Sequence, residues 1–321
     1  MKPITLTKIA DNLTDQQHFE IAEKLAFHKI DGIELSTAGS RWGATWKPDT
    51  NYDLTFLQFY KGIKAIRIHL PGVTNLQPLL PLADALEDLH LGEFKDKKVS
   101  IDLIGQLHNL NHLSVVRHPT GLACITRLPK LTALSLTGYA IDKLPFLNTL
   151  QHLRRLYIGF GTSKNISTIS QLKNLEELDI LWVKQLADIN AISSLTGLVK
   201  LKIEDEKQIK ILPDLSKLRQ LKNIRLMNLM SLEDISSLLN SFVEEFIITG
   251  PNKNADFLIP VAKSDCVKKI YTAFYLKKEE AKAEKFLGNK FCQPDKMEYE
   301  MGHMKRQQLQ YFDYLTGQQI I

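Results

Sequence analysis

One leucine-rich phrase recurs along most of this chain and constrains its fold more than any other feature. It reads Leu-x-x-Leu-x-x-Leu-x-Leu, with other apolar residues at some of these positions, and it returns about every 22 residues. The six most regular copies begin at Leu107, Leu128, Leu150, Leu172, Leu195 and Leu218. Degenerate copies begin at Tyr60 and Ala83, and a last one ends at Ile248. A chain that repeats one short unit so often is expected to stack its units in a row.

The end of each phrase predicts a short β-strand, because apolar residues alternate there with other residues. A second apolar stretch follows with a spacing of three, as in Ile166, Ile169 and Leu172, and this spacing favours a 3-10 turn. One unit alone buries too little apolar surface to offset the entropy of ordering it. We therefore predict an α/β solenoid with a curved parallel β-sheet on its concave side, 3-10 or short helical turns on its convex side, and helical caps at both ends.

In these phrases the chain resembles leucine-rich-repeat proteins of the 22-residue class, which includes the internalins and the regulatory subunit of protein phosphatase 1. The phrases that begin at Leu186 and Leu232 match the turn of that class, which is leucine, small residue, aspartate and isoleucine. The resemblance implies a leucine-rich-repeat solenoid, but no particular function, because the class binds unrelated partners.

This chain departs from that class at one position in each repeat. The class usually carries an asparagine three residues after the last leucine of the strand, where its side chain hydrogen-bonds the stacked loops. The corresponding residues here are Pro71, Phe94, His118, Tyr139, Gly161, Val183, Glu206 and Leu229. The loops must therefore be held together in another way.

We predict one elongated body in three parts. Residues 1–59 form an N-terminal cap, residues 60–250 form about nine repeats, and residues 251–321 form a C-terminal cap. In the N-terminal part, Thr14 and Gln17 have the spacing of a capping box and predict the start of a helix. A first strand is expected shortly after this helix.

An insertion of about ten residues separates that first strand from the next one. It contains Arg41, Trp42 and Trp46 among glycine and serine residues, which is the most unusual local composition in the chain. One interpretation is a cap loop that is fixed by tryptophan packing. The other is a loop at the rim of the solenoid that contacts a ligand.

The C-terminal part loses the repeat rhythm after Gly250. A strand is predicted near Ile270 and a helix over residues 276–287, where lysine and glutamate alternate as on a solvated helix. The aromatic stretch 296–316 either packs on the last repeat or binds a partner.

Composition excludes several classes of protein. The 321 residues are 44% hydrophobic, which suffices for a large core, and the net charge of +5 is mild. Because no concentrated basic stripe is visible, we expect no nucleic-acid or membrane partner. The sequence shows no signal peptide and no membrane-spanning run, and three scattered cysteines form neither a disulfide framework nor a zinc motif. We predict a cytoplasmic protein of bacterial type that needs no cofactor and no metal.

The residues between the buried strand positions are expected to line the concave face and to bind the partner. Aromatic side chains ringed by charges are typical of an interface hot spot, although some of them instead fill uneven stacking between repeats. The candidate residues are Arg155, Tyr157, Phe160, Glu177, Asp179, Leu181, Trp182, Lys200, Lys202 and Arg225.

The predicted function is therefore non-catalytic recognition of a protein of unknown identity, as a regulatory, adaptor or immunity-type subunit. The alternative is an enzyme or a metal-dependent activity. It would use the C-terminal segment or a patch in which His90 and His112 face each other on neighbouring strands, with Asp88 beside them.

Overall fold

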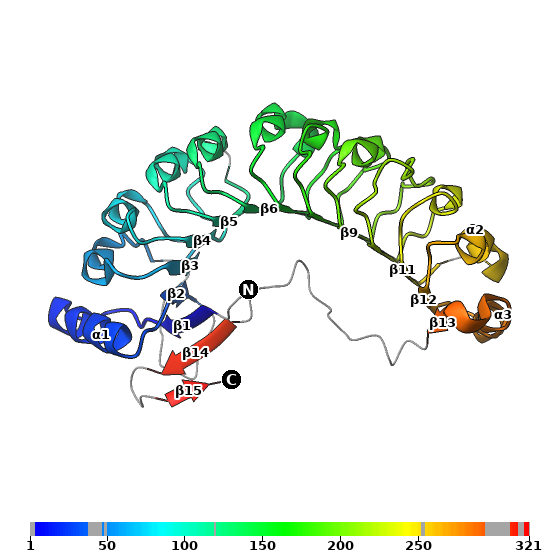
Figure 1. The fold of residues 1–321 in the computed structure, drawn as a ribbon. Helices are drawn as coiled ribbons and strands as arrows, with labels where there is room; N and C mark the ends of the chain where they lie inside the picture. The colour runs from blue at the N-terminus through cyan, green and yellow to red at the C-terminus, as the bar shows by residue number, and fades with distance from the viewer. Residues whose placement is uncertain are drawn as a thin grey trace. The chain divides into compact units, whose positions relative to one another are not determined.

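The computed structural model describes residues 4–37, 47, 50–118, 120–251, 254–292, 309–313 and 318–320. The chain divides into two compact units. The first contains Met1–Ser135 and Lys305–Ile321, and the second contains Leu136–Met304. In each unit, short strands lie on one side of the coils and short helical turns lie on the other side (Figure 1).

The first unit contains a sheet with the strand order β15-β14-β1-β2-β3-β4-β5. Its strands are β1 (Ile4–Lys8), β2 (Gly32–Ser36), β3 (Ala65–His69), β4 (Asp88–Leu91), β5 (His112–Val116), β14 (Leu309–Asp313) and β15 (Gln318–Ile320). Neighbouring strands run parallel, except that β14 and β15 are antiparallel. Strand β6 (Ala133–Thr137) contains the point at which the two units divide.

The second unit contains a parallel sheet with the strand order β7-β8-β9-β10-β11-β12-β13. Its strands are β7 (Arg155–Gly159), β8 (Glu177–Leu181), β9 (Lys200–Glu204), β10 (Asn223–Met227), β11 (Glu245–Thr249), β12 (Lys269–Ala273) and β13 (Phe291–Cys292). Each strand pairs with its neighbour along the chain, as expected for stacked repeats.

Short 3-10 helices follow most of the strands, as the spacing of three predicts. In the first unit they are η1 (Thr55–Tyr60), η2 (Gln77–Leu82), η3 (Asp102–Gln106) and η4 (Leu122–Arg127). In the second unit they are η5 (Ile141–Lys143), η6 (Pro145–Thr149), η7 (Ser167–Ile169), η8 (Asn190–Ser194), η9 (Ser236–Leu238), η10 (Ala255–Leu258) and η11 (Gly288–Lys290). The α-helices are α1 (Asp15–Phe27), α2 (Ile259–Lys263) and α3 (Lys277–Leu287). Among the described residues, none of the helices has the length and apolar character needed to cross a bilayer.

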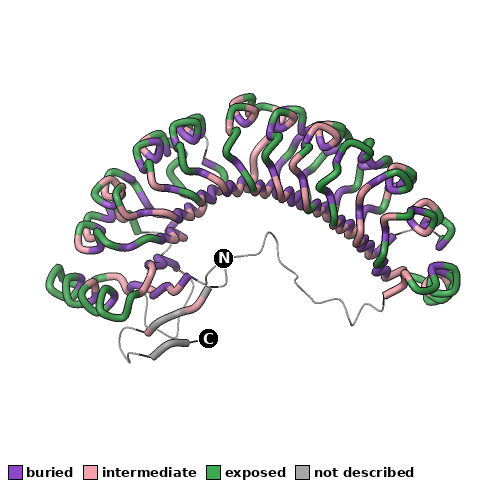
Figure 2. Tube along the Cα trace, in the orientation of Figure 1, coloured by how far each residue is buried: buried purple, intermediate pink, exposed green. Residues whose placement is uncertain are grey.

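The core of each unit lies inside the coils and consists of the phrase positions. In the repeat around β5, Leu107, Leu110 and Leu113 are all completely buried. Figure 2 shows the buried residues along the strands and on the inner side of the turns. The predicted leucine-rich-repeat solenoid, with its parallel sheet and 3-10 turns, is therefore confirmed.

The aspartates of the turn phrase have a structural role. The Oδ1 atom of Asp188 accepts a hydrogen bond from the Asn190 N–H at 2.9 Å, and Asp234 accepts one from the Ser236 N–H at 2.7 Å. In this way each aspartate satisfies an N–H at the start of a 3-10 turn that has no partner within the turn. These side chains explain the turn phrase by local structure rather than by function.

The N-terminal part of the first unit adds a strand that the sequence analysis missed. Strand β1 pairs with β2 before the first predicted strand. The predicted helix forms as α1, and Thr14 and Gln17 make the expected capping box. Its buried face contains Ile21 and Leu25, whereas Phe19 is 48% exposed, because it projects from another side of the helix.

The C-terminal part is divided between the two units. The predicted strand and helix are present as β12 and α3 in the second unit. Strand β14, however, pairs with β1 in the first unit, with Ile4 opposite Leu309. The stretch 309–313 therefore extends the N-terminal sheet, an arrangement that neither of the two interpretations of the stretch 296–316 included.

Candidate functional site

Most of the predicted partner-binding residues lie on four neighbouring strands of the second unit. The side chains of β7–β10 that alternate with the buried apolar residues point away from the core inside the coils. They form what we call the outer sheet face, which is the face that the sequence analysis calls concave. Its central row consists of Tyr157, Asp179, Lys202 and Arg225, which pair in register. A second row beside it consists of Arg155, Glu177, Lys200 and Asn223. The parallel register therefore brings together residues that are far apart in the sequence.

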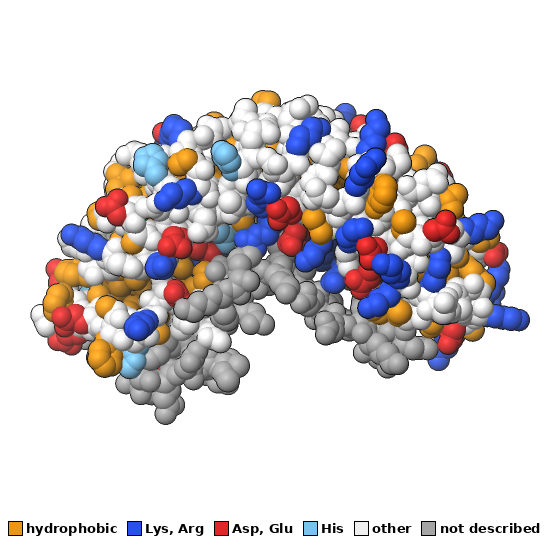
Figure 3. All heavy atoms as spheres, in the orientation of Figure 1, with side chains coloured by type: hydrophobic (Ala, Val, Ile, Leu, Met, Phe, Trp, Pro, Cys, Tyr) orange, Lys and Arg blue, Asp and Glu red, His pale blue; other side chains and the backbone are white. Residues whose placement is uncertain are grey.

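Charges on the outer sheet face are partly neutralised by neighbours of opposite sign. Lys200 Nζ lies 3.3 Å from a carboxylate oxygen of Glu177 on the adjacent strand, and Lys202 lies 2.7 Å from Glu204 on its own strand. Basic and acidic side chains are also intermingled over the second unit in Figure 3. This surface thus presents paired charges of both signs.

Two large aromatic residues lie at one edge of the outer sheet face. Phe160 directly follows β7 and is 42% exposed, and Trp182 directly follows β8 and is 51% exposed. Their rings meet edge to face, with centroids 5.6 Å apart and an angle of 68° between the planes. We call these two residues the rim aromatic pair. The two rings are thus in direct contact with each other.

The rim aromatic pair has an unusual backbone conformation. The φ angle is +55° at Phe160 and +46° at Trp182, in the left-handed region that bulky residues rarely adopt. The first residues after five other strands are also left-handed, and they are Arg117, Gly138, Asp205, Asn228 and Gly250. Glycine, asparagine and aspartate tolerate this conformation, whereas it costs other residues roughly 1–2 kcal/mol.

The left-handed conformation follows from the stacking of the strands. The Phe160 N–H donates to the Leu181 carbonyl at 2.9 Å, and the Trp182 N–H donates to the Glu204 carbonyl at 3.0 Å. Each loop therefore continues the ladder of the sheet by one residue before the chain turns away. The fold therefore requires a left-handed residue after each of these strands, but it does not require that residue to be aromatic.

Leu181 and Asp179 were predicted to be exposed, and this expectation is wrong. Only 8% of Leu181 and 3% of Asp179 is accessible. The Tyr157 ring lies along its own strand against Gly159, so closely that a Cβ on this glycine would collide with the tyrosine hydroxyl. Leu181 is the register partner of Gly159, and the tyrosine ring is therefore close to it. The exposed aromatic surface at this rim is thus Phe160 with Trp182.

Two polar residues at the position of the missing asparagine connect stacked loops. In the second unit, Glu206 Oε1 accepts a hydrogen bond from the Val183 N–H at 2.6 Å. In the first unit, His118 Nε2 lies 2.9 Å from the Gly92 carbonyl oxygen. Both side chains are almost completely buried. Each of them makes a loop-to-loop hydrogen bond of the kind that the resemblance assigns to asparagine.

The predicted rim loop cannot be compared with the structure. Arg41, Trp42 and Trp46 lie outside the described residues. Their contact with a ligand remains a proposal.

The histidine patch in the first unit differs from the prediction. His112 Nδ1 lies 2.8 Å from Asp88 Oδ2 on the adjacent strand, whereas the His90 ring contacts the His69 ring, with centroids 4.6 Å apart. His90 and His112 thus have different partners, because the register places Asp88 opposite His112 and Ser114 opposite His90.

Burial disfavours the charged form of the His69 and His90 rings, because it lowers the pKa of both. Burial, together with the nearby His69 and Arg67, lowers the pKa of His90 to about 3. Burial alone would raise the pKa of Asp88, but its hydrogen bond with His112 holds that pKa below the ordinary value. Within the described ranges, no group of three or more histidine, cysteine, aspartate or glutamate side chains is placed to hold a metal ion.

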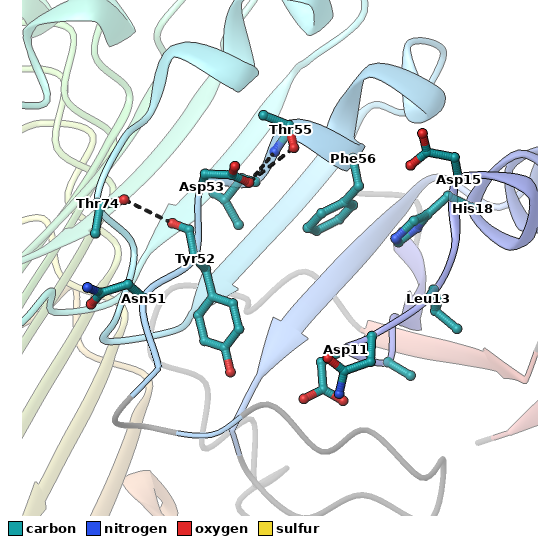
Figure 4. Close-up of a pocket in the computed structure, with 13 residues that line it drawn as sticks. Asp11, Leu13, Asp15, His18, Asn51, Tyr52, Asp53, Thr55, Phe56 and Thr74 are labelled. Atoms are coloured by element: carbon teal, nitrogen blue, oxygen red, sulfur yellow. Dashed lines mark hydrogen bonds between the residues drawn. The ribbon is translucent and has the colours of Figure 1, made fainter.

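A cavity of about 470 Å³ lies in the first unit beside the start of α1. Its walls include the carboxylates of Asp11, Asp15 and Asp53 (Figure 4). The His18 ring stacks on Phe56 with centroids 4.6 Å apart, and its Nδ1 atom lies 2.9 Å from the Tyr60 hydroxyl. Burial lowers the pKa of His18, although Asp15 raises it. His18 is therefore a packed, hydrogen-bonded residue of the cavity wall.

The sequence analysis missed a second exposed apolar group in the second unit. Tyr275 is 63% exposed, and its hydroxyl lies 3.9 Å from the sulfur of Met230, which is 38% exposed. Leu276, directly after Tyr275, is 56% exposed. Met230 follows the C-terminal end of β10, and Tyr275 and Leu276 follow the C-terminal end of β12. The rim aromatic pair likewise follows the C-terminal ends of its strands.

Comparison with solved structures supports the fold. An internalin (InlF) from Listeria monocytogenes superposes with a TM-score of 0.51 and 17% identity, over 85% of this chain and 69% of the internalin. TLR13 in complex with a single-stranded RNA superposes with a TM-score of 0.52 and 17% identity, over 84% of this chain and 46% of TLR13. No protein-family model and no curated protein sequence matches the chain. These similarities establish the leucine-rich-repeat fold and nothing further.

Proposed function

We propose that this protein is a non-catalytic solenoid that recognises a protein partner through the outer sheet face of its second unit. The rim aromatic pair anchors the partner, and the paired charges beside it set the orientation. In this role the protein acts as a regulatory, adaptor or immunity-type subunit. We place it in the cytoplasm, where cysteines such as Cys124, Cys266 and Cys292 stay reduced.

One observation carries this proposal. Phe160 and Trp182 are large, exposed and adjacent, and both occupy a backbone conformation in which glycine or asparagine would be more stable. Neighbouring repeats show that the fold accepts such residues, since Asn228 and Gly250 occupy the same position. Exposed aromatics that lower stability are best explained by a binding role.

The chemistry of the surrounding surface favours a protein over other ligands. Tryptophan and phenylalanine give apolar contact area, while the pairs Glu177–Lys200 and Lys202–Glu204 offer donors and acceptors of both signs. Repeats that are already packed lose little freedom when a partner docks, so little binding energy is spent on ordering. TLR13 was crystallised with RNA, so the fold itself does not decide the kind of ligand.

The test is a capture experiment with matched variants. Wild-type protein and the double variant Phe160→Asn/Trp182→Asn are immobilised and exposed to lysate of the organism that encodes the chain, and bound proteins are identified by mass spectrometry. A partner that is retained by wild type and lost by the double variant is expected. The control is Phe27→Asn on α1, which removes an 82% exposed aromatic in the first unit. Equal capture by the double variant would contradict the proposal.

A further inference from the structure

Glu206 is a buried carboxyl group beside the rim. It is 1% exposed and lies two residues after β9. Its Oε1 atom accepts the hydrogen bond from Val183, whereas its Oε2 atom is buried and has no hydrogen-bond partner in the described part of the chain. A buried carboxyl with one unsatisfied oxygen is costly, so its presence here needs an explanation.

The N–H group that Glu206 holds belongs to the residue after Trp182. Val183 is 1% exposed, so its N–H cannot reach bulk water and depends on the glutamate. The preceding N–H, of Trp182 itself, donates to the Glu204 carbonyl. Two successive hydrogen bonds to the next repeat therefore fix the chain on both sides of the left-handed Trp182.

We infer that Glu206 is a positioning residue for the rim aromatic pair: through Val183 it holds Trp182 in its exposed left-handed conformation against Phe160. The hydrogen bond itself does not depend on any partner. Its consequence for binding rests on the function proposed above. When the Glu206 side chain moves out into water, the Val183 N–H loses its acceptor and Trp182 is no longer held against Phe160. We call this state the open rim, and the state with the Glu206–Val183 hydrogen bond the closed rim.

The equilibrium between buried and solvent-exposed Glu206 depends on pH. The pKa of Glu206 is raised to about 7, mainly by burial and to a smaller extent by the neighbouring Asp205, while the hydrogen bond from the Val183 N–H opposes the rise. Asp205 in turn accepts a hydrogen bond from Asn228 of the next repeat at 3.1 Å, and Lys184, next to Val183, is exposed. Because the buried form holds its proton more tightly than an exposed glutamate, rising pH favours the open rim. The closed rim is most stable below about pH 4.5, the ordinary pKa of glutamate, and its advantage is lost as the pH rises through 7.

The test compares Glu206→Gln with Glu206→Ala. Glutamine keeps an oxygen at the position of Oε1 but does not titrate, whereas alanine removes the acceptor. The corresponding loop contact of the first unit is changed in the control, His118→Gln. The first measurement is the amide-exchange protection factor of Val183 by NMR between pH 5 and pH 8. The second is the emission of Trp182 over the same range, with Trp42 and Trp46 replaced by phenylalanine.

In wild type, Val183 protection should fall by more than tenfold between pH 5 and pH 8, and the Trp182 emission should shift with it. Glu206→Gln should keep high protection at all pH values, Glu206→Ala should lack it, and His118→Gln should behave as wild type. The same pH profile in wild type and Glu206→Gln would overturn the inference, even if the alanine variant did not fold. Both measurements use the protein without a partner, so they are independent of the capture experiment that tests the proposed function.

Discussion

Phe160 and Trp182 occupy the same place in successive repeats, and their rings meet edge to face while both residues adopt left-handed backbone angles. The contact contributes some stability, typically 0.5–1.5 kcal/mol beyond burial for an aromatic pair. The left-handed conformation costs about as much for each residue. Because two residues carry this cost and only one contact offsets it, the arrangement lowers the stability of the fold, and its value is expected to lie in binding.

Trp182→Asn should bind the partner poorly and yet leave the free energy of unfolding within about 1 kcal/mol of wild type. The loss of the ring contact is offset because asparagine tolerates a positive φ. Trp182→Val should be less stable than Trp182→Asn, since a β-branched residue does not tolerate this conformation. Urea unfolding of both variants measures the difference. A stable valine variant and an unstable asparagine variant would show that Trp182 is mainly a packing residue.

Tyr157→Ala combined with Trp182→Ala should abolish binding without disrupting the fold. Neither side chain is part of the leucine core, and so the thermal melt followed by circular dichroism should stay near that of wild type. Binding is measured against the partner identified by capture. A large fall in melting temperature would instead assign both aromatics to the structural core.

Glu206→Gln should remove a pH dependence of stability. Because folding raises the pKa of Glu206 from 4.5 to about 7, its favourable contribution is complete below pH 4.5 and is lost as the pH rises through 7. Above that range wild type should be less stable than Glu206→Gln by up to about 3 kcal/mol. Chemical denaturation at pH 5 and pH 8 gives the two differences. If the gap between the variants does not widen with pH, the carboxyl group is not buried as described.

Gly161→Ala should destabilise the second unit by about 1–3 kcal/mol, since a Cβ there would collide with the carbonyl oxygen of Tyr139. The matched control is Gly62→Ala, where the added Cβ meets nothing within 4 Å. Urea denaturation compares the two variants. Equal stability would mean that the loops of adjacent repeats separate easily at this point.

Zinc titration should separate the binding hypothesis from the metal-dependent alternative. Wild type and the variant His69→Ala/His90→Ala should give the same calorimetric response, because the described residues do not converge three ligands on one point. A tight isotherm in wild type that the double variant lacks would favour a metal site in the first unit.

The sequence predicts the repetitive part of the fold well, because stacking repeats must bury the same phrase in each copy. Leu110 and Leu113 are buried as expected, and the central row of the outer sheet face follows from the strand period. The alternation in residues 4–8 also has a strand pattern, but it lies outside the repeat phrase from which the strands were predicted. Pairing of β14 with β1 was not predictable, because no repeat relates two segments so distant in sequence.

The candidate site was predicted less completely, since side-chain direction depends on neighbours. Leu181 is buried, and Tyr157 lies against Gly159, the register partner of Leu181; an isolated strand pattern contains neither piece of information. The sequence does contain a signal for the left-handed conformation at Trp182, because Gly138, Asn228 and Gly250 occupy the same position in other repeats. An alignment of the repeats against one another, with attention to glycine and asparagine, would have revealed it.

The pairing of β14 with β1 also affects how the molecule is made. On the ribosome, β14 emerges about 300 residues after β1. Until then the free side of β1 exposes unpaired backbone groups, so a nascent chain carries an open template for strand addition while the rest of it is translated. Completion of the first sheet is thereby delayed until nearly all of this sequence has been produced.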